Sequence, residues 1–304
     1  HDGKPLRRYE EAKQTAANYR KIEKEIRGTT VKADVAFIYD YDSIWALRFQ
    51  PGYPGNSFQA AMSRYYNALF RAGINAAMIP PTGDFSHYKI IFAPDLYILP
   101  DAVANRLDDF VKNGGILVTD CRAGTKDETG LMHERTLPGL LSDALGIRIE
   151  EYEAIPSKMR YDVQGELGEF AAIHYADWVI PETAVVVEKF VAPWHMADFA
   201  AVTKNDYGTG QGWYVGSVFQ DEQFYDAFAK KILAVANIQP IVSPPPGVEV
   251  SLRQGEGNKL LFIINHTDEI KIVNVPPGKT ELLTGKQTDD QLEMDRYGVA
   301  VLKL

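Results

Sequence analysis

The fold of this chain is decided by VKADVAFIYDYDSIWAL (residues 31–47), YKIIFAPDLYILP (88–100) and NGGILVTDCRAGT (113–125). Each is an apolar run that ends in polar or turn residues, which is typical of a strand buried on both faces of a sheet. Two segments with helical periodicity lie between them, SFQAAMSRYYNALFRAG (57–73) and PDAVANRLDDFVKNG (100–114). With a further short strand after the first helix, this order predicts an α/β fold with a doubly wound parallel sheet.

The carboxyl ends of these strands carry polar and aromatic residues. They are Asp40, Tyr41, Asp42, Trp45, Asp95, Asp120 and Cys121. Ligands of open α/β sheets bind at this edge. The chain therefore has a candidate site there, which serves either chemistry or the assembly of subunits.

Composition narrows the class of protein. Of the 304 residues, 45% are hydrophobic and 24% charged, values typical of a soluble globular protein with two or three domains. The net charge of -9 argues against a nucleic-acid or anionic-membrane partner, because both attract clustered lysine and arginine. One cysteine excludes an internal disulfide and any multi-cysteine metal site, which favours a reducing compartment. No apolar run reaches the roughly 18 residues of a membrane span.

The N-terminal segment is predicted to be one isolated helix. Residues 6–27 place apolar side chains three or four positions apart, with charges between them. Such a helix either packs on the following domain or is the last helix of a preceding one, and the periodicity favours neither. The chain starts at His1 without an initiator methionine. We expect either a processed terminus or a piece of a longer protein, and the second is our first hypothesis.

The sheet domain is predicted to end with a helix at 221–236. A long loop is expected at 43–56, carrying its aromatic residues away from the sheet, and residues 155–220 are rich in β signals around a glycine-rich turn. A stiff proline linker at 243–247 follows. Beyond it, short strands separated by Gly, Asn, Asp and Pro predict a small antiparallel β-sandwich.

Cys121 is the first candidate for chemistry, because it lies at the end of a parallel strand. A cysteine nucleophile of the amidotransferase type needs a sharp strand-to-helix turn, oxyanion donors and a histidine oriented by an acid. Arg-Ala-Gly and a polar loop follow Cys121 instead, and none of His133, His174 and His195 lies in a His-x-Glu context. A buried, inert cysteine is therefore the preferred interpretation, with a cysteine hydrolase as the alternative.

Acidic residues near the strand ends are candidate cation ligands. They are Asp40, Asp42, Asp120, Asp127 and Glu128. Hard oxygen ligands suit a divalent cation. However, neither an EF-hand spacing nor a phosphate-binding glycine loop accompanies them, and aspartates at strand ends commonly cap turns and helices. We therefore expect no metal site and no cofactor.

Large aromatic residues are candidates for sugar stacking or for a subunit interface. They are Trp45, Phe49, Tyr53, Trp178, Trp194 and Trp213. Aromatic side chains are favoured in interface cores and in ligand pockets alike, and packing is the default interpretation.

Several sequence blocks resemble a known family in their content and order. The first two strand stretches quoted above, the helix with Arg64-Tyr65-Tyr66, NGGILVTDCRAGTKDE (113–128) and LLSDALGIRIEEYE (140–153) resemble the middle domain of glycoside hydrolase family 42 β-galactosidases. The resemblance runs over essentially the whole chain.

Both ends of the chain extend the resemblance. FIINHTDE (262–269), LLTGK (282–286) and RYGVAVLKL (296–304) look like that family's small C-terminal β domain. HDGKPLRRYEEAKQTAANYRKI (1–22) is similar to the segment that finishes its catalytic barrel.

The resemblance implies an architecture for the parent protein. It consists of a (β/α)8 barrel, an amidotransferase-like (flavodoxin-like) domain that mediates trimer formation, and a β domain. Residues 1–30 are then the last helix of a missing barrel, 31–242 the trimerisation domain and 243–304 the C-terminal antiparallel β domain. The two catalytic glutamates of the retaining mechanism, and the zinc-binding cysteines of some members, belong to the barrel. No catalytic residue is therefore carried over to this chain.

The function implied is the non-catalytic assembly portion of a cytoplasmic β-galactosidase, inactive by itself and forming a homotrimer. Galactoside would be bound only through the missing barrel. Tyr41, Trp45 and Phe49 are the candidate residues that contact substrate or a neighbouring subunit. The alternatives are a stand-alone amidotransferase-like hydrolase that uses Cys121 and a carbohydrate-binding or structural module.

Overall fold

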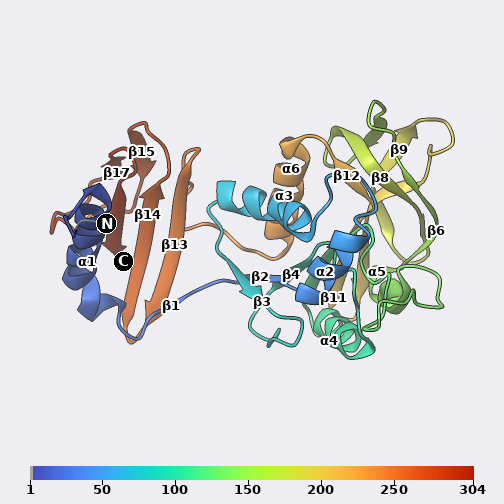
Figure 1. Cartoon of the computed structure of the whole chain (residues 1–304), viewed down its shortest axis with the longest axis horizontal. Coiled ribbons are helices and arrows are strands. Elements are labelled where there is room, and N and C mark those ends of the chain that lie inside the picture. Colours follow the sequence, from blue (N-terminus) through green and yellow to red (C-terminus); the bar gives the residue numbers. More distant parts are fainter. Residues whose placement is uncertain (1–2) are drawn as a thin grey trace. The chain divides into compact units, whose positions relative to one another are not determined.

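The computed structural model describes residues 3–304, which form two compact units (Figure 1). The sheet unit contains residues 34–69 and 76–239. The small unit contains the segment up to residue 33 together with residues 70–75 and 240–304. His1, where the sequence suggests a cut, lies outside the described residues.

A five-stranded parallel sheet forms the centre of the sheet unit. Its strands are β2 (Val35–Ile38), β3 (Ala76–Ile79), β4 (Ile90–Ala93), β5 (Ile116–Asp120) and β11 (Gly210–Val215). They lie in the order β3-β2-β4-β5-β11, and each neighbouring pair is parallel. Every residue of β2, β4 and β5 is buried, as the continuous apolar runs predict. The expected α/β class is confirmed.

Helices cover both faces of this sheet (Figure 1). They are α3 (Phe58–Arg71) and α6 (Glu222–Val235) on one face, and α4 (Asp101–Lys112), a 3-10 turn (Gly139–Leu141) and α5 (Ser142–Leu145) on the other. Successive side chains of a strand point to opposite faces. Accordingly, Phe92 of β4 has its ring centroid 5.6 Å from that of Tyr65 on α3, while its neighbour Ile91 packs in a cluster with Leu107 of α4.

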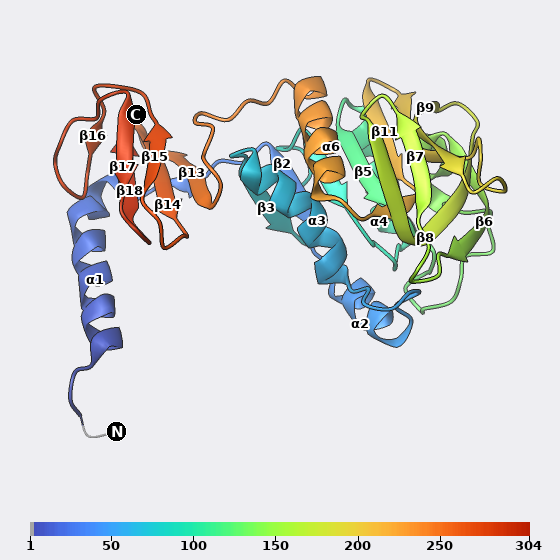
Figure 2. The same ribbon diagram turned by 90° about the horizontal axis from the view of Figure 1, so that it is seen from above.

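An antiparallel extension continues the sheet beyond β11 (Figure 2). Its strands are β6 (Ile147–Ala154), β7 (Tyr161–Gly165), β8 (Glu169–Pro181), β9 (Val185–Ala192), β10 (Ala200–Tyr207) and β12 (Ser217–Phe219). β10 pairs with β11, followed by β9, β7, β8 and β12, and β6 pairs with β8. The β signals at 155–220 predicted strands here, but β7 and β8 were not singled out: β7 has only five residues, and His174 and Asp177 interrupt the apolar run of β8.

The prediction of a loop at 43–56 is wrong over much of that range, because a helix, α2 (Tyr41–Phe49), covers its first part. The Asp40 carboxylate caps this helix by accepting hydrogen bonds from the backbone N–H groups of Asp42 (3.4 Å) and Ser43 (2.8 Å). A cap of this kind stabilises a helix by about 1 kcal/mol. Trp45 and Phe49, two of the aromatic residues that the loop was expected to carry, therefore lie on a regular helix, whereas Tyr53 lies in the loop after it and is buried.

Two antiparallel sheets form the core of the small unit. One has the order β1 (Thr30–Val31), β13 (Val248–Gly255), β14 (Asn258–Asn265), β18 (Val299–Lys303) and β16 (Thr280–Glu281), and the other pairs β15 (Lys271–Asn274) with β17 (Gln291–Met294). Leu261 and Ile263 of β14 pack in one cluster with Val273 of β15 and Met294 of β17. The expected antiparallel β region is present, although β17 was not predicted.

The helix α1 (Arg7–Ile26) belongs to the small unit. Its Ile22 is buried with Leu260 of β14 and Val301 of β18, while Tyr9 and Tyr19 of the same helix are exposed. Neither α1 nor another helix of residues 3–304 has the length and apolarity that crossing a membrane requires.

Candidate functional site

Two aspartates meet at the carboxyl edge of the parallel sheet. Asp95 follows β4, and its backbone N–H donates a hydrogen bond of 2.7 Å to Oδ1 of Asp120, the last residue of β5. The Tyr65 hydroxyl donates to Asp120 Oδ2 at 3.3 Å, and the Asn56 amide donates to Asp95 Oδ2 at 3.0 Å. Burial raises the pKa of both carboxyl groups. The pair is therefore a structural link and is unsuited to holding a cation.

The thiol of Cys121 is buried in a cluster with Tyr53, Tyr175 and Val218. Burial raises the pKa of this thiol well above its ordinary value, and the nearby carboxyl of Asp120 raises it further. Because the thiolate is the nucleophilic form of cysteine, this position disfavours covalent catalysis.

The three candidate histidines supply no base for that thiol. His174 stacks on Tyr53, with ring centroids 5.5 Å apart, and burial lowers its pKa. His133 Nε2 lies 3.1 Å from a backbone carbonyl oxygen, and His195 Nε2 lies 3.1 Å from a glutamate oxygen. Within the described chain, no hydrogen bond joins a histidine to the Cys121 thiol. The cysteine-hydrolase alternative thus lacks the histidine base that its mechanism requires.

The acidic residues considered as cation ligands do not gather at one place. Asp40 caps α2, and Asp120 lies in the buried pair. The Asp127 carboxylate accepts hydrogen bonds from the backbone N–H groups of Thr129 (2.8 Å) and Leu131 (3.0 Å). Over residues 3–304, no group of three or more His, Cys, Asp or Glu is placed to hold a metal ion.

Tyr41, Trp45 and Phe49 form an exposed strip on α2. Their four-residue spacing places the three side chains above one another on one helix face. They are 61%, 54% and 87% exposed, and the rings of Tyr41 and Trp45 lie 6.0 Å apart. We call this surface the α2 aromatic strip.

The other candidate aromatics are dispersed. Trp213 is fully buried, Tyr53 is buried beside Cys121, and Trp178 packs on Phe199 with ring centroids 5.1 Å apart. Trp194 is 88% exposed in the turn after β9. No common sugar platform is formed by these residues.

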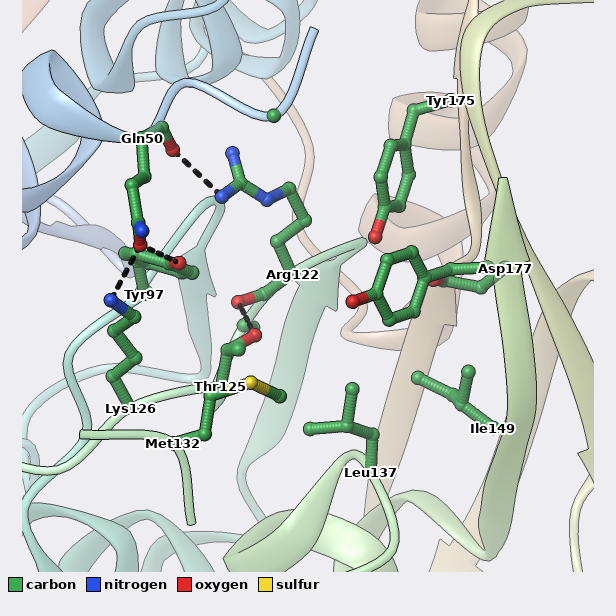
Figure 3. A pocket seen from close by; sticks show the side chains of 13 residues that line it. Gln50, Tyr97, Arg122, Thr125, Lys126, Met132, Leu137, Ile149, Tyr175 and Asp177 are labelled. Atoms are coloured by element: carbon green, nitrogen blue, oxygen red, sulfur yellow. Dashed lines mark hydrogen bonds between the residues drawn. The ribbon is translucent and has the colours of Figure 1, made fainter. Parts of the chain in front are cut away.

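A cavity of about 320 Å³ lies at the carboxyl end of β5 (Figure 3). Its lining includes Arg122 and Lys126 on one side, Tyr175 and Asp177 opposite them, and an apolar floor. None of these four residues was singled out from the sequence. The one signal that could have indicated the cavity is the position of Arg122, two residues after the strand-end aspartate.

The Arg122 guanidinium is fixed by the loop after α2. It donates hydrogen bonds to the carbonyl oxygens of Pro51 and, at 2.8 Å, Gln50, and it lies 4.5 Å from the ring centroid of Tyr97. Gly52 has a φ of +82°, and a Cβ there would lie 2.4 Å from a guanidinium nitrogen. Glycine is therefore favoured at this point of the loop, because a side chain there would be strained and would displace the guanidinium.

Asp177 on the opposite wall titrates near neutrality. Burial raises the pKa of Asp177 to about 7, while the hydrogen bond of 2.6 Å from the Tyr214 hydroxyl acts in the other direction. The cavity thus combines fixed cations with a weakly ionised carboxyl group. Because the buried Cys121 thiol beside the cavity is not a reactive thiolate, the cavity is suited to binding a ligand and not to covalent chemistry.

Comparison with known proteins gives the class. Residues 33–239 match the family model described as "Beta-galactosidase trimerisation domain", and residues 247–304 match the model "Beta-galactosidase C-terminal domain". The chain belongs to the glycoside hydrolase family 42 β-galactosidases.

Curated relatives and solved structures agree with this class. β-Galactosidase BgaB of Geobacillus sp. (strain Y412MC61) is 31% identical over 300 residues, which are 97% of this chain and 44% of that protein. β-Galactosidase Pbg of Clostridium perfringens is 30% identical over 292 residues, 92% of this chain and 42% of that protein. The chain thus spans less than half the length of these relatives.

Two solved structures resemble the whole chain. The β-galactosidase of Bacillus circulans sp. alkalophilus has a TM-score of 0.93 and 27% identity, covering 100% of this chain and 46% of that one. The β-galactosidase of Halorubrum lacusprofundi has a TM-score of 0.87 and 27% identity, covering 100% of this chain and 44% of that one.

Proposed function

We propose that this chain is the non-catalytic assembly portion of a β-galactosidase and that it joins subunits into a homotrimer. The observation that carries the proposal is the match of 33–239 to a trimerisation domain, followed by a match of 247–304 to a C-terminal domain. In this proposal residues 1–30 close the catalytic barrel, 31–242 form the trimerisation domain and 243–304 form the C-terminal β domain.

Catalysis is assigned to the barrel of the parent enzyme. Two glutamates there would hydrolyse terminal β-D-galactosides with retention of configuration, and the galactoside would be bound there alone. The share of the relatives that the chain matches, 44% for BgaB, supports this division. The buried thiol of Cys121, without a histidine partner in residues 3–304, supports it as well.

The α2 aromatic strip is the proposed contact with a neighbouring copy of the chain. Aromatic residues are enriched in interface cores, and rigid rings lose little conformational freedom when they become buried. Tyr41, Trp45 and Phe49 present three such rings on one regular helix. A second copy is the expected occupant because the matched domain type is described by trimerisation.

The strand order supports an amidotransferase-like, doubly wound domain. Numbered along the chain, the five parallel strands lie in the order 2-1-3-4-5, which is the flavodoxin-like order. Helices on both faces of the sheet agree with it. The single free cysteine, Cys121, suits a reducing cytoplasm, and assembly requires neither a metal nor a cofactor.

Two measurements on the purified chain test this proposal. Analytical ultracentrifugation is expected to show a species with three times the 34.0 kDa mass of the chain. An aryl β-galactoside is expected to remain unhydrolysed, with a full-length β-galactosidase as the positive control. A strict monomer at high concentration would contradict the assembly role. Robust hydrolysis would contradict the assignment of catalysis to the barrel.

A further inference from the structure

Arg122 is a buried cation that lacks a carboxylate partner. Only 9% of the residue is exposed. Among residues 3–304, its guanidinium binds two backbone carbonyl oxygens and lies over the ring of Tyr97, but it forms no ion pair. Arginine is rarely buried unless a negative charge pairs with it. Asp95 and Asp177 lie near enough for the Arg122 charge to lower the pKa of both against the raising effect of burial, but neither forms an ion pair with it.

The backbone of Arg122 is strained at the edge of the cavity. Its φ of +72° lies in the left-handed region, which is unfavourable for a residue with a side chain. The Thr125 hydroxyl donates a hydrogen bond of 2.7 Å to the Arg122 carbonyl oxygen and holds the turn. Strained residues concentrate at ligand sites, where the surrounding structure fixes them. Arg122 also follows β5 at the edge where parallel sheets bind ligands.

The cavity has a charged end and an apolar end (Figure 3). Lys126 Nζ donates a hydrogen bond of 2.5 Å to Gln50 Oε1, which places a second cation on the wall of Arg122. Leu137 and Ile149 line the other end. The volume of about 320 Å³ is at the lower limit of small-molecule pockets, about 300 Å³.

We propose that this cavity binds a small organic monocarboxylate, with its carboxylate at the wall that carries Arg122 and Lys126 and its apolar body against Leu137 and Ile149. A guanidinium has five N–H donors, and the two backbone carbonyls leave donors for a carboxylate, whose planar geometry matches the arginine fork. A bound carboxylate would thereby supply the direct ion pair that Arg122 lacks within residues 3–304.

The opposite wall selects a monoanion over phosphate or sulfate. Asp177 faces the two cations across the cavity and repels additional negative charge when it is ionised. The apolar end cannot donate hydrogen bonds to further oxygens. A carboxylate with a branched or ring-shaped hydrocarbon body satisfies both ends. The cavity shares no residue with the α2 aromatic strip, although Gln50 of its lining directly follows Phe49, and ligand binding is measured separately from assembly.

Isothermal titration calorimetry with 4-methylpentanoate tests the proposal directly on the whole chain. The expected dissociation constant is about 1 mM or lower, within the limits for so small a ligand. The amide 4-methylpentanamide has the same shape without the charge and should bind at least about tenfold more weakly, because a charged hydrogen bond is lost. Equal binding of the amide, stronger binding of inorganic phosphate, or no binding of the carboxylate would overturn the proposal.

Variants locate the binding. Lys126→Met should weaken carboxylate binding roughly tenfold or more, and Lys126→Arg should retain it. Lys230→Met removes an exposed lysine of α6 that does not line the cavity, and it should change nothing. Lys126 is chosen because Arg122 also holds the loop after α2. Unchanged binding in Lys126→Met, with circular dichroism confirming its fold, would contradict the proposed site.

Discussion

The backbone N–H of Asp95 and the Oδ1 atom of Asp120 are joined by a buried hydrogen bond of 2.7 Å. It connects the carboxyl ends of β4 and β5, the edge at which parallel sheets commonly bind ligands. Asp95 adopts a φ of +48° at this point. Asp95 and Asp120, which the sequence suggests as candidates for chemistry, are thus hydrogen-bonded to each other and close this part of the edge. The neighbouring cavity at Arg122 remains open to ligands.

Asp120→Asn should leave the free energy of unfolding nearly unchanged, whereas Asp120→Ala should lower it by about 1–3 kcal/mol. The amide keeps the shape of the carboxyl group and an acceptor for the Asp95 N–H, and burial, which raises the pKa of Asp120, disfavours the charge that the amide lacks. Alanine leaves that buried N–H unsatisfied. Urea unfolding at neutral pH measures both variants. Equal losses in the two variants would indicate that the ionised carboxylate is required.

Cys121 should react slowly with iodoacetamide in the folded chain. Burial raises the pKa of its thiol and shields it from the reagent. Mass spectrometry of samples labelled at pH 7.5 should show alkylation at least about a hundredfold slower in buffer than in concentrated urea. Equal rates would mean that the thiol is accessible and would return the cysteine-hydrolase alternative to consideration.

Continuous apolar runs made the parallel strands predictable. The runs around Phe37, Ile91 and Val118 are buried on both faces, so pattern and structure agree almost residue by residue. The helix after Pro100 was also predictable, because its apolar residues recur at helical spacing. It begins at Asp101, as expected. α2 was missed because the glycines and prolines just after it suggested a loop. Helix capping was considered for the strand-end aspartates in general, but Asp40 was not assigned to the start of this helix.

The cavity was less predictable than the fold. Arg122 and Lys126 lie four residues apart in a polar loop, which gives no periodicity to read. The significance of Arg122 depends on its burial and on the absence of an ion-pair partner within residues 3–304, and both are properties of the folded chain. Tyr41, Trp45 and Phe49 were named from the sequence, but whether they contact another subunit stays a prediction.

Phe49→Ser should weaken trimer formation by at least about tenfold, because aromatic anchors near an interface centre dominate binding free energy. Its side chain is 87% exposed in the single chain, so folding should be unaffected. Trp194→Ser is the matched control, since Trp194 is 88% exposed elsewhere in the same unit. Sedimentation velocity over a concentration series measures both. A loss confined to Trp194→Ser would move the interface from α2 to the turn after β9.

Asp177→Asn should become more stable relative to the wild type as the pH rises. Burial raises the pKa of Asp177 from 3.8 to about 7, so between these values the folded state binds the proton more strongly than the unfolded state. Stability of the wild type is therefore lost as the pH rises toward 7, and the variant escapes this loss while keeping an acceptor for the Tyr214 hydroxyl.

Between pH 5 and pH 8 the difference in unfolding free energy should shift by roughly 2–3 kcal/mol in favour of Asp177→Asn, since each unit of pKa difference corresponds to about 1.4 kcal/mol. Urea unfolding of both proteins at the two pH values, without added carboxylate, measures the shift. Glu182→Gln is a suitable control, because its side chain is 54% exposed and pairs at the surface with Arg148. A difference between wild type and Asp177→Asn that stays constant with pH would mean that Asp177 is already ionised at pH 5, and the cavity would then oppose a bound carboxylate.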